Sequence, residues 1–183
     1  MIDLLEIEKN LISRHVMPGG TAVDFTMGNG HDTLWLSNAV GENGHVYAFD
    51  IQEQALKNAG KLLESNALYR NYSLILDSHA NAEKYVDGHI CTGMFNLGYL
   101  PGSDKSVTTL RQSTMCAVEA ALRLLDCDGG LLIAVYPGHE EGRLEGEMLE
   151  KYFSGLDRRK ICVSEFKIVN SPDSPFFFLV EKK

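Results

Sequence analysis

The 183-residue sequence lacks the segments that would place it in a membrane or carry it out of the cell. No apolar run approaches the roughly 20 residues that a helix needs to span a bilayer. The first residues, Met1 to Glu6, have neither the basic start nor the apolar stretch of a signal peptide. We therefore expect a cytoplasmic protein without a membrane partner.

Metal-binding patterns are missing as well. The six histidines do not cluster at ligand spacing, and the four cysteines form no C-x-x-C pair, so we predict no metal site. Reduced and mostly buried thiols, as in a cytoplasmic protein, are expected for Cys91, Cys116, Cys127 and Cys162.

Positive charge is scarce, because 17 Lys and Arg residues stand against 25 Asp and Glu, for a net charge of −8. This balance argues against a protein that coats nucleic acid without specificity, since such binding depends on neutralising phosphates. It leaves room for a local basic patch, for which the candidates are Lys105, Arg111, Arg158, Arg159 and Lys160.

Short β-rich runs alternate with helical runs along the chain, which favours an α/β domain with a seven-stranded, mostly parallel sheet. Strands are expected at 21–26, 45–50, 72–76, 90–97, 131–136, 160–169 and 176–181, with helices at 3–15, 31–40, 52–65, 82–85, 106–125 and 140–153. The short join at 170–175 predicts a C-terminal antiparallel hairpin. No repeat or linker interrupts the pattern, so a single domain over 1–183 is predicted.

A glycine turn after the first predicted strand carries the main functional signal. It reads Asp24-Phe25-Thr26-Met27-Gly28-Asn29-Gly30. Glycines there let the backbone approach a ligand, and ligands of open α/β sheets bind at the carboxyl ends of the strands. Asp50 ends the second strand and can accept hydrogen bonds from both ribose hydroxyls of an adenosine. We therefore predict a nucleoside-containing cofactor bound by Gly28, Gly30 and Asp50.

Two details favour S-adenosylmethionine over a dinucleotide as that cofactor. Dinucleotide sites prefer G-x-G-x-x-G, whereas Thr33 stands at the third glycine position. Asp24 is unfavourable beside a pyrophosphate, but it suits a ligand that carries an amino group and a sulfonium. The alternative for Asp24 is a helix cap without a ligand role.

The segment Asp77-Ser78-His79 follows the third strand, at the position that contacts adenine in this architecture. Ser78 and His79 can supply hydrogen bonds or stacking. Alternatively, His79 only begins a helix.

The predicted substrate side begins where the fourth strand ends, at Phe95-Asn96-Leu97-Gly98-Tyr99-Leu100-Pro101-Gly102. This run is similar to the Asn-Pro-Pro-Tyr motif of amino-group methyltransferases, in which an Asn side chain and a backbone carbonyl accept hydrogen bonds from the target nitrogen. Asn96 is then the side-chain acceptor, Leu97 supplies the carbonyl, and Tyr99 stacks on the base. Leu97 and Gly98 replace the two prolines, so a purely structural turn is the alternative.

The fifth strand ends in Val135-Tyr136-Pro137-Gly138-His139, with a Pro-Gly turn at the same edge of the sheet. Tyr136 and His139 are therefore candidate catalytic residues that face the substrate. A surface or core histidine is the alternative for His139.

Five segments together resemble the putative rRNA methylase family of Gram-positive bacteria, whose members are tRNA 5-(aminomethyl)-2-thiouridine methyltransferases. They are residues 24–33, 49–52, 77–80, 95–102 and 136–139, and the resemblance covers nearly the whole chain. It implies a Rossmann-like class I methyltransferase fold with helices on both faces of the sheet. It also implies methylation of the aminomethyl nitrogen on the wobble uridine, in the anticodon region of certain tRNAs.

The resemblance implies roles for individual residues as well. Cofactor contacts are implied for Asn29, Asp32, Asp50, Gln52, Ser78 and His79. Contacts with the tRNA base are implied for Met27, Gly98, Tyr99, Tyr136 and His139. Lys105 is a further candidate for substrate binding, and two copies of the chain in a homodimer are expected to share the RNA.

Three other functions are compatible with the sequence. The same site can serve an rRNA methyltransferase or a small-molecule methyltransferase, and the acidic charge favours the latter. A nucleotide-sensing module without enzymatic activity is the alternative of a different class. Such a module would bind S-adenosylmethionine without turnover on any RNA.

Overall fold

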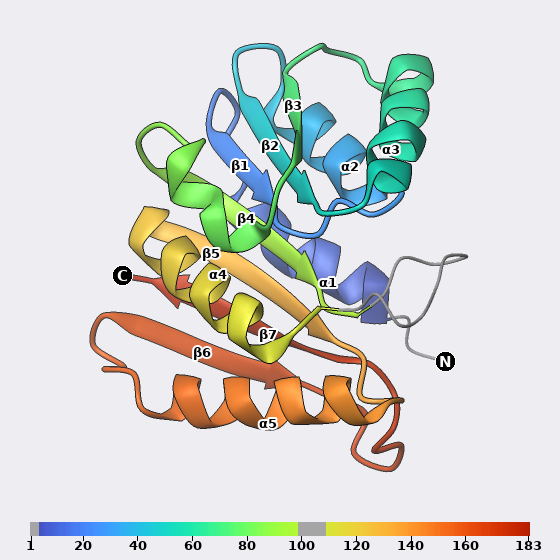
Figure 1. Cartoon of the computed structure of the whole chain (residues 1–183). Coiled ribbons are helices and arrows are strands. Elements are labelled where there is room, and N and C mark those ends of the chain that lie inside the picture. Colours follow the sequence, from blue (N-terminus) through green and yellow to red (C-terminus); the bar gives the residue numbers. More distant parts are fainter. Residues whose placement is uncertain (1–3, 99–108) are drawn as a thin grey trace.

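The computed structural model describes residues 4–98 and 109–183 (Figure 1). The predicted substrate residues Tyr99 and Lys105 lie outside these ranges. The strands are β1 (Thr21–Asp24), β2 (His45–Asp50), β3 (Tyr72–Leu76), β4 (Ile90–Asn96), β5 (Leu125–Val135), β6 (Ile161–Phe166) and β7 (Phe176–Lys182). The α-helices are α1 (Leu4–Ile12), α2 (His31–Val40), α3 (Glu53–Asn66), α4 (Arg111–Leu124) and α5 (Glu140–Ser154), and the 3₁₀ helices are η1 (Ser13–His15) and η2 (His79–Lys84).

All seven strands belong to one sheet with the order β3-β2-β1-β4-β5-β7-β6. Strands β1 to β5 pair in parallel, whereas β7 runs antiparallel to both β5 and β6. The predicted mostly parallel sheet and the C-terminal hairpin are therefore confirmed. The chain turns from one half of the sheet to the other between β1 and β4, and open α/β sheets bind ligands at the carboxyl edge of such a switch point.

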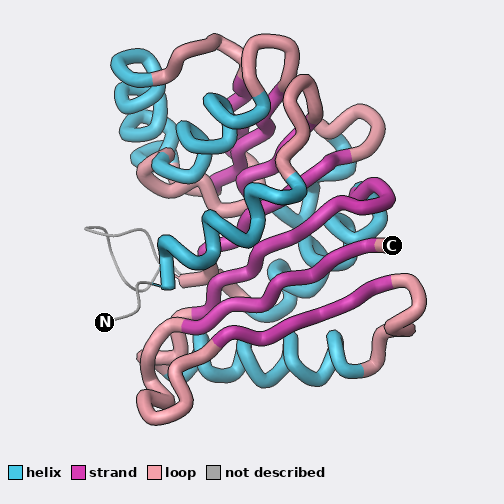
Figure 2. The backbone as a smooth tube through the Cα atoms, turned by 180° about the vertical axis from the view of Figure 1, so that it is seen from behind, coloured by secondary structure: helices cyan, strands magenta, loops and turns pink. Residues whose placement is uncertain are grey.

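Helices cover both faces of the sheet, as predicted. Helices α1, α2 and α3 lie on the face seen in Figure 2, and η2, α4 and α5 lie on the face seen in Figure 1. Apolar side chains of the strands pack against the helices on both faces of the sheet, because successive side chains of a strand point to opposite faces. In β5, Leu131 and Ile133 pack toward α4 and α5, whereas Leu132 and Ala134 pack toward α1 and α2.

The start of β5 differs from the prediction, which began this strand at residue 131. The strand begins at Leu125, which pairs with Ile90, and the next pair is Thr92 with Gly130. The extra residues of β5 form a bulge in which Asp128 has a positive φ of 60°. The polar and glycine residues between Leu125 and Gly130 interrupt the pairing of β5 with β4. The pairing resumes at Gly130.

The expectation of mostly buried thiols is wrong. Cys91 is buried and Cys162 is intermediate, but Cys116 and Cys127 are exposed. Cys127 lies in the β5 bulge and Cys116 on the outer side of α4, where the local pattern does not require burial. No helix among the described residues is long and apolar enough to cross a membrane.

Candidate functional site

The predicted site residues converge on one edge of the sheet. Strands β1, β2 and β4 are parallel neighbours or near neighbours, and each carries a polar residue at its carboxyl end: Asp24, Asp50 and Asn96, respectively. Tyr136 directly follows β5 at the same edge. The structure therefore brings together residues that lie more than a hundred positions apart in the sequence.

Asp50 is held in place by the backbone of the glycine loop. Its Oδ2 accepts a hydrogen bond from the Gly28 amide at 3.0 Å, and its Oδ1 accepts one from the Gln52 amide at 2.9 Å. Burial raises the pKa of the Asp50 carboxyl, and the backbone hydrogen bonds only partly offset this effect. Each carboxylate oxygen can accept a second hydrogen bond. The half-buried Asp50 is thus oriented as an acceptor for a pair of ribose hydroxyls.

Two exposed apolar residues flank Asp50 and were missed by sequence reasoning. Ile51, which directly follows β2, is 61% exposed, and Leu76, the last residue of β3, is 48% exposed. Asp50 and Leu76 are register partners across β2 and β3. A flat apolar ring such as adenine would cover these side chains while its ribose meets Asp50. The signal in the sequence was the apolar residue directly after the strand-ending carboxylate.

Gly30 is required by helix packing, and its close approach to a ligand stays a prediction. It has a φ of +87°, and a Cβ added there would lie 2.7 Å from the Ala59 Cβ and 2.8 Å from the Ala59 Cα. Ala59 is fully buried on α3. The second glycine of the loop therefore permits the close approach of α2 and α3 behind the site.

We expect Gly30→Ala to destabilise the protein by about 3 kcal/mol, because left-handed backbone strain and overpacking against α3 add together. Gly88→Ala is the matched control, since Gly88 has a φ of +82° but nothing lies within 4 Å of an added Cβ. It should cost only about 1 kcal/mol. Urea unfolding of both variants measures the difference, and equal losses would contradict the packing role.

Asp24 is almost completely buried, with 1% of its surface exposed. Its Oδ2 accepts a hydrogen bond from the Thr33 hydroxyl at 2.6 Å, and its Oδ1 accepts one from the Thr26 amide at 3.1 Å. Thr33 occupies the position of the missing third glycine, so its hydroxyl has a structural use. These contacts anchor the loop to α2, and direct contact between Asp24 and a cofactor stays a prediction.

Burial raises the pKa of Asp24 from 3.8 to about 7, and the nearby Asp32 and Asp50 carboxylates add to this shift. The folded state therefore holds this proton more tightly than the unfolded chain does. The proton-linked stability is fully present below pH 3.8 and is lost as the pH rises toward about 7.

We expect Asp24→Asn to remove this titration while keeping the shape of the side chain. The difference in unfolding free energy between the variant and the wild type should grow by up to about 4 kcal/mol between pH 4 and pH 7. Urea unfolding of the ligand-free proteins across that range checks it. Parallel pH profiles of the two proteins would contradict the assignment.

Several residues implied as cofactor or base contacts are engaged within the protein. Met27 is 3% exposed and packs with Ala48 and Leu63, so its side chain lies in the core and not on a substrate surface. Asn29 accepts a hydrogen bond from the Asn58 side chain at 2.9 Å, which ties the loop to α3. Gln52 contributes its backbone amide to Asp50.

Ser78 and His79 organise the turn after β3. The Ser78 hydroxyl accepts a hydrogen bond from the Ala80 amide and caps η2. His79 is 8% exposed, and its Nδ1 lies 3.0 Å from the Phe25 carbonyl. Because a carbonyl can only accept, Nδ1 carries the proton, and burial lowers the pKa of the ring. A neutral His79 thus links η2 to the end of β1, and its contact with adenine stays a prediction.

Asn96 lies at the centre of a polar cluster at the end of β4. Its Nδ2 donates to Asp32 Oδ2 at 2.6 Å, and its Oδ1 accepts from the Tyr136 hydroxyl at 3.3 Å. Lys9 of α1 lies 3.2 Å from Asp32 Oδ1. Burial and the nearby Glu8 and Asp32 raise the pKa of Tyr136, which keeps its phenol protonated. The predicted pair Asn96 and Tyr136 is in contact, whereas Lys9 and Glu8 were missed because α1 carries no motif.

The turn after Asn96 is fastened to the two outer helices. Leu97 is 1% exposed, and its amide donates to the Ala134 carbonyl. Gly98 exchanges two hydrogen bonds with Thr109, whose hydroxyl in turn donates to Glu145 Oε2 at 2.9 Å. Glu145 is fully buried on α5 and burial raises its pKa. Gly98 and Thr109 are therefore held next to each other, close to the end of β4.

His139 begins α5 as its N-cap, because its Nδ1 accepts a hydrogen bond from the Gly142 amide at 3.0 Å. In the neutral ring the proton therefore resides on Nε2. This capping contact gives His139 a structural role, and a catalytic role for it stays a prediction.

The predicted basic patch is divided by the fold. Residues 158–160 directly precede β6. The first residue of β6 pairs with Lys182 of β7, and the neighbouring Glu181 pairs with Gly130 near the start of β5. They therefore lie at the edge opposite Asn96 and Tyr136. Arg159 also pairs with Asp157 at 2.9 Å, and Arg111 pairs with Glu141 at 3.0 Å. Arg158, Arg159 and Lys160 are thus poorly placed to contact a substrate at the predicted site.

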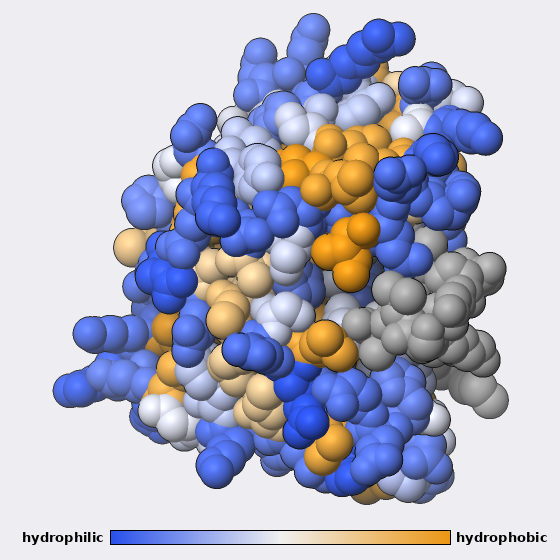
Figure 3. Space-filling model, viewed as in Figure 1, coloured by the Kyte–Doolittle hydropathy of each residue, from blue (hydrophilic) through white to orange (hydrophobic). Residues whose placement is uncertain are grey.

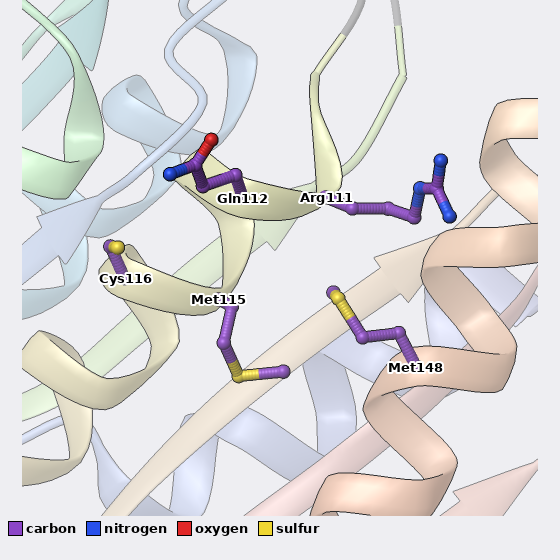
Figure 4. Close-up of a pocket in the computed structure, with 5 residues that line it drawn as sticks. All are labelled: Arg111, Gln112, Met115, Cys116 and Met148. Atoms are coloured by element: carbon purple, nitrogen blue, oxygen red, sulfur yellow. The ribbon is translucent and has the colours of Figure 1, made fainter.

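A shallow hollow between α4 and α5 contains none of the predicted cofactor or catalytic residues. In Figure 4, Met115 and Met148 point toward each other between the two helices, beside Cys116 and Gln112. The face shown in Figure 3 is mainly hydrophilic and is interrupted by separate hydrophobic patches. The hollow offers no carboxylate or convergent acceptors, so the sheet edge is the better candidate site.

The edge as a whole favours a ligand with positive charge. Asp24, Asp32, Asp50 and Glu8 are near one another or near Tyr136, and Lys9 is the cation found to pair with this group in the described part of the chain. A pyrophosphate would be repelled by these carboxylates. An adenosine that carries a cationic sulfonium and an amino group fits the ribose acceptor, the apolar flank and the charge.

Comparisons with known proteins agree with this geometry. A family model described as "Putative rRNA methylase" matches residues 46–182. A chloroplastic tRNA (mnm(5)s(2)U34)-methyltransferase from Arabidopsis thaliana is 35% identical over 178 residues, which cover 92% of this chain and 65% of that protein. The chain thus spans somewhat less than two thirds of that relative's length.

Two solved structures superpose over 100% of this chain and 99% of their own. One is described as a putative rRNA-methylase from Clostridium thermocellum, with 36% identity and a TM-score of 0.95. The other is described as a putative methyltransferase from Streptococcus mutans in complex with SAH, with 35% identity and a TM-score of 0.89.

Proposed function

The chain belongs to the rRNA methylase family, and from this premise we propose that it methylates the 5-aminomethyl nitrogen of the wobble (2-thio)uridine in tRNA. It is an S-adenosylmethionine-dependent methyltransferase by fold and family. The observation that carries the substrate proposal is the Asn96 amide, which is held between Asp32 and Tyr136 with its oxygen available as an acceptor. The name of the Arabidopsis relative supports the choice of nitrogen.

The chemistry is a direct displacement at a methyl group. When bound, S-adenosylmethionine supplies a methyl on a sulfonium, so attack by an amine lone pair forms the N–C bond while the C–S electron pair returns to sulfur. The chain's own contribution is orientation of the amine. Asn96 Oδ1 and the Leu97 carbonyl can each accept one amine N–H, which directs the remaining lone pair. Only the free amine has that lone pair, and the positive charge of a sulfonium bound nearby would lower the pKa of the amine and so favour the free form.

The proposal is tested with tRNA from cells that lack this enzyme. Purified protein and S-adenosylmethionine with a deuterated methyl group are incubated with that tRNA, and the nucleosides are analysed by mass spectrometry. We expect the aminomethyluridine to be consumed and a product that carries the labelled methyl to appear. Transcribed tRNA without modifications is the control, because it lacks the amine.

Parallel reactions separate the alternatives. Label in rRNA but not in tRNA would overturn the proposed substrate in favour of rRNA. Calorimetric binding of S-adenosylmethionine without label in any RNA would point to a small-molecule methyltransferase or to the nucleotide-sensing module. Contacts confined to the anticodon region predict a weak dependence of tRNA binding on salt.

We further propose a homodimer that shares one tRNA between its subunits, because the described surface near Asn96 offers few cations beyond Lys9. Light scattering of the protein alone and with tRNA tests the assembly. A monomer under both conditions would contradict it.

A further inference from the structure

Asp32 connects α1 to the substrate side of the site through both of its carboxylate oxygens. Oδ1 lies 3.2 Å from Lys9 Nζ, and Oδ2 accepts the Asn96 Nδ2 proton at 2.6 Å. The Asp32 side chain is only 16% exposed, compared with 36% for Lys9. Both of its strongest contacts thus lie within the protein, and neither belongs to the ribose acceptor at Asp50.

The contact with Asp32 decides which way the Asn96 amide faces. A carboxylate can only accept hydrogen bonds, so the amide nitrogen must point toward Asp32 and the amide oxygen toward Tyr136. The Asn96 backbone is fixed independently, because its amide donates to the Thr26 hydroxyl at 2.6 Å. Without Asp32 the amide could rotate by half a turn and present two N–H donors to the site. Two donors cannot accept a hydrogen bond from an amine.

The positive charge of Lys9 partly neutralises the Asp32 carboxylate, which lies close to other acidic side chains. Asp32 raises the pKa of Asp24, and Glu8 together with Asp32 raises the pKa of Tyr136. The Lys9 ammonium therefore offsets a repulsion that would otherwise push Asp32 away from this cluster. It also anchors α1 to the first turn of α2.

We propose that Lys9 and Asp32 form a positioning pair that holds the Asn96 amide oxygen toward the amine substrate. This inference rests on the proposed function, since it assumes a substrate that donates N–H groups to Asn96. Neither residue touches the reacting atoms, and both act through Asn96.

Kinetics of four variants test the pair. Asp32→Ala should lower kcat for tRNA by about 10- to 100-fold, because a hydrogen bond to a charged acceptor is lost. Lys9→Met should lower kcat about two- to five-fold, and Lys9→Arg should restore it. KM for tRNA and the calorimetric Kd for S-adenosylmethionine should stay within about two-fold for all three, since the pair acts on orientation alone. Lys57→Met, which removes an exposed lysine paired with Glu53 on α3, is the matched control and should be neutral.

A large loss of S-adenosylmethionine affinity in Asp32→Ala, with kcat unchanged, would overturn the proposal and make Asp32 a cofactor residue. A readout without substrate keeps the two proposals separable. The Asn96 side-chain amide protons are assigned by NMR with the help of Asn96→Asp, and their exchange with solvent is measured. Faster exchange in Asp32→Ala and Lys9→Met is expected even if no RNA is methylated. Unchanged exchange would overturn the pair even if tRNA is the substrate.

Discussion

Replacing Asn96 by Ala is expected to lower kcat on tRNA by about 100-fold or more while leaving the affinity for S-adenosylmethionine unchanged. The substitution removes the acceptor that we propose orients the amine, and loss of orientation alone costs about two orders of magnitude. The fold should survive, because the strand amide at position 96 still donates to Thr26 and the side chain is only partly buried.

Single-turnover rates with saturating tRNA and cofactor measure the effect of Asn96→Ala directly. Asn66→Ala is the control, since Asn66 lies exposed at the end of α3 and bonds only to the Leu62 carbonyl. A rate for Asn96→Ala close to that of the control would show that Asn96 has no part in the reaction. A drop in both rate and cofactor affinity would indicate that the whole edge has been disturbed.

Replacing Asp50 by Ala is expected to weaken binding of S-adenosylmethionine by about 100-fold or more. The half-buried carboxylate would lose two charge-assisted hydrogen bonds to the ribose, each worth about 1.5 kcal/mol or more. Gly28 would also lose the acceptor that holds its amide at 3.0 Å, so the glycine loop would be less ordered. Calorimetry on the purified proteins measures this loss.

The pH dependence of cofactor binding gives a second measure of the role of Asp50. Burial raises the pKa of this carboxyl, so it takes up a proton at a higher pH than an ordinary aspartate does. Affinity should therefore fall as the pH is lowered through that raised pKa, and Asp50→Asn should show no such fall. Glu53→Gln is the control, because Glu53 is exposed and forms an ion pair with Lys57 on the same helix. Equal affinities of Asp50→Ala and Glu53→Gln for S-adenosylmethionine would show that Asp50 does not bind the ribose.

The sheet and the main positions of the site could be predicted because they depend on local patterns. Apolar runs mark β1, β2 and β4, and the residues at their ends must share one edge of a parallel sheet. That rule alone places Asp24, Asp50 and Asn96 near one another. The bulge in β5 could not be predicted, because only the pairing of Leu125 with Ile90 shows that the strand begins before the break.

What each site residue contacts was decided by tertiary structure. The sequence determined the order of strands and turns along the chain, the acidic character of the site and its similarity to methyltransferases. It did not determine that Gly30 faces Ala59, that Met27 is a core residue, or that Asp32 joins Lys9 to Asn96. Those contacts link helices that follow different strands, and helix packing is set by side chains from several elements at once. A motif predicts which residues lie at the carboxyl edge of the sheet. The packing of α1, α2 and α3 determines which residue each of them contacts there.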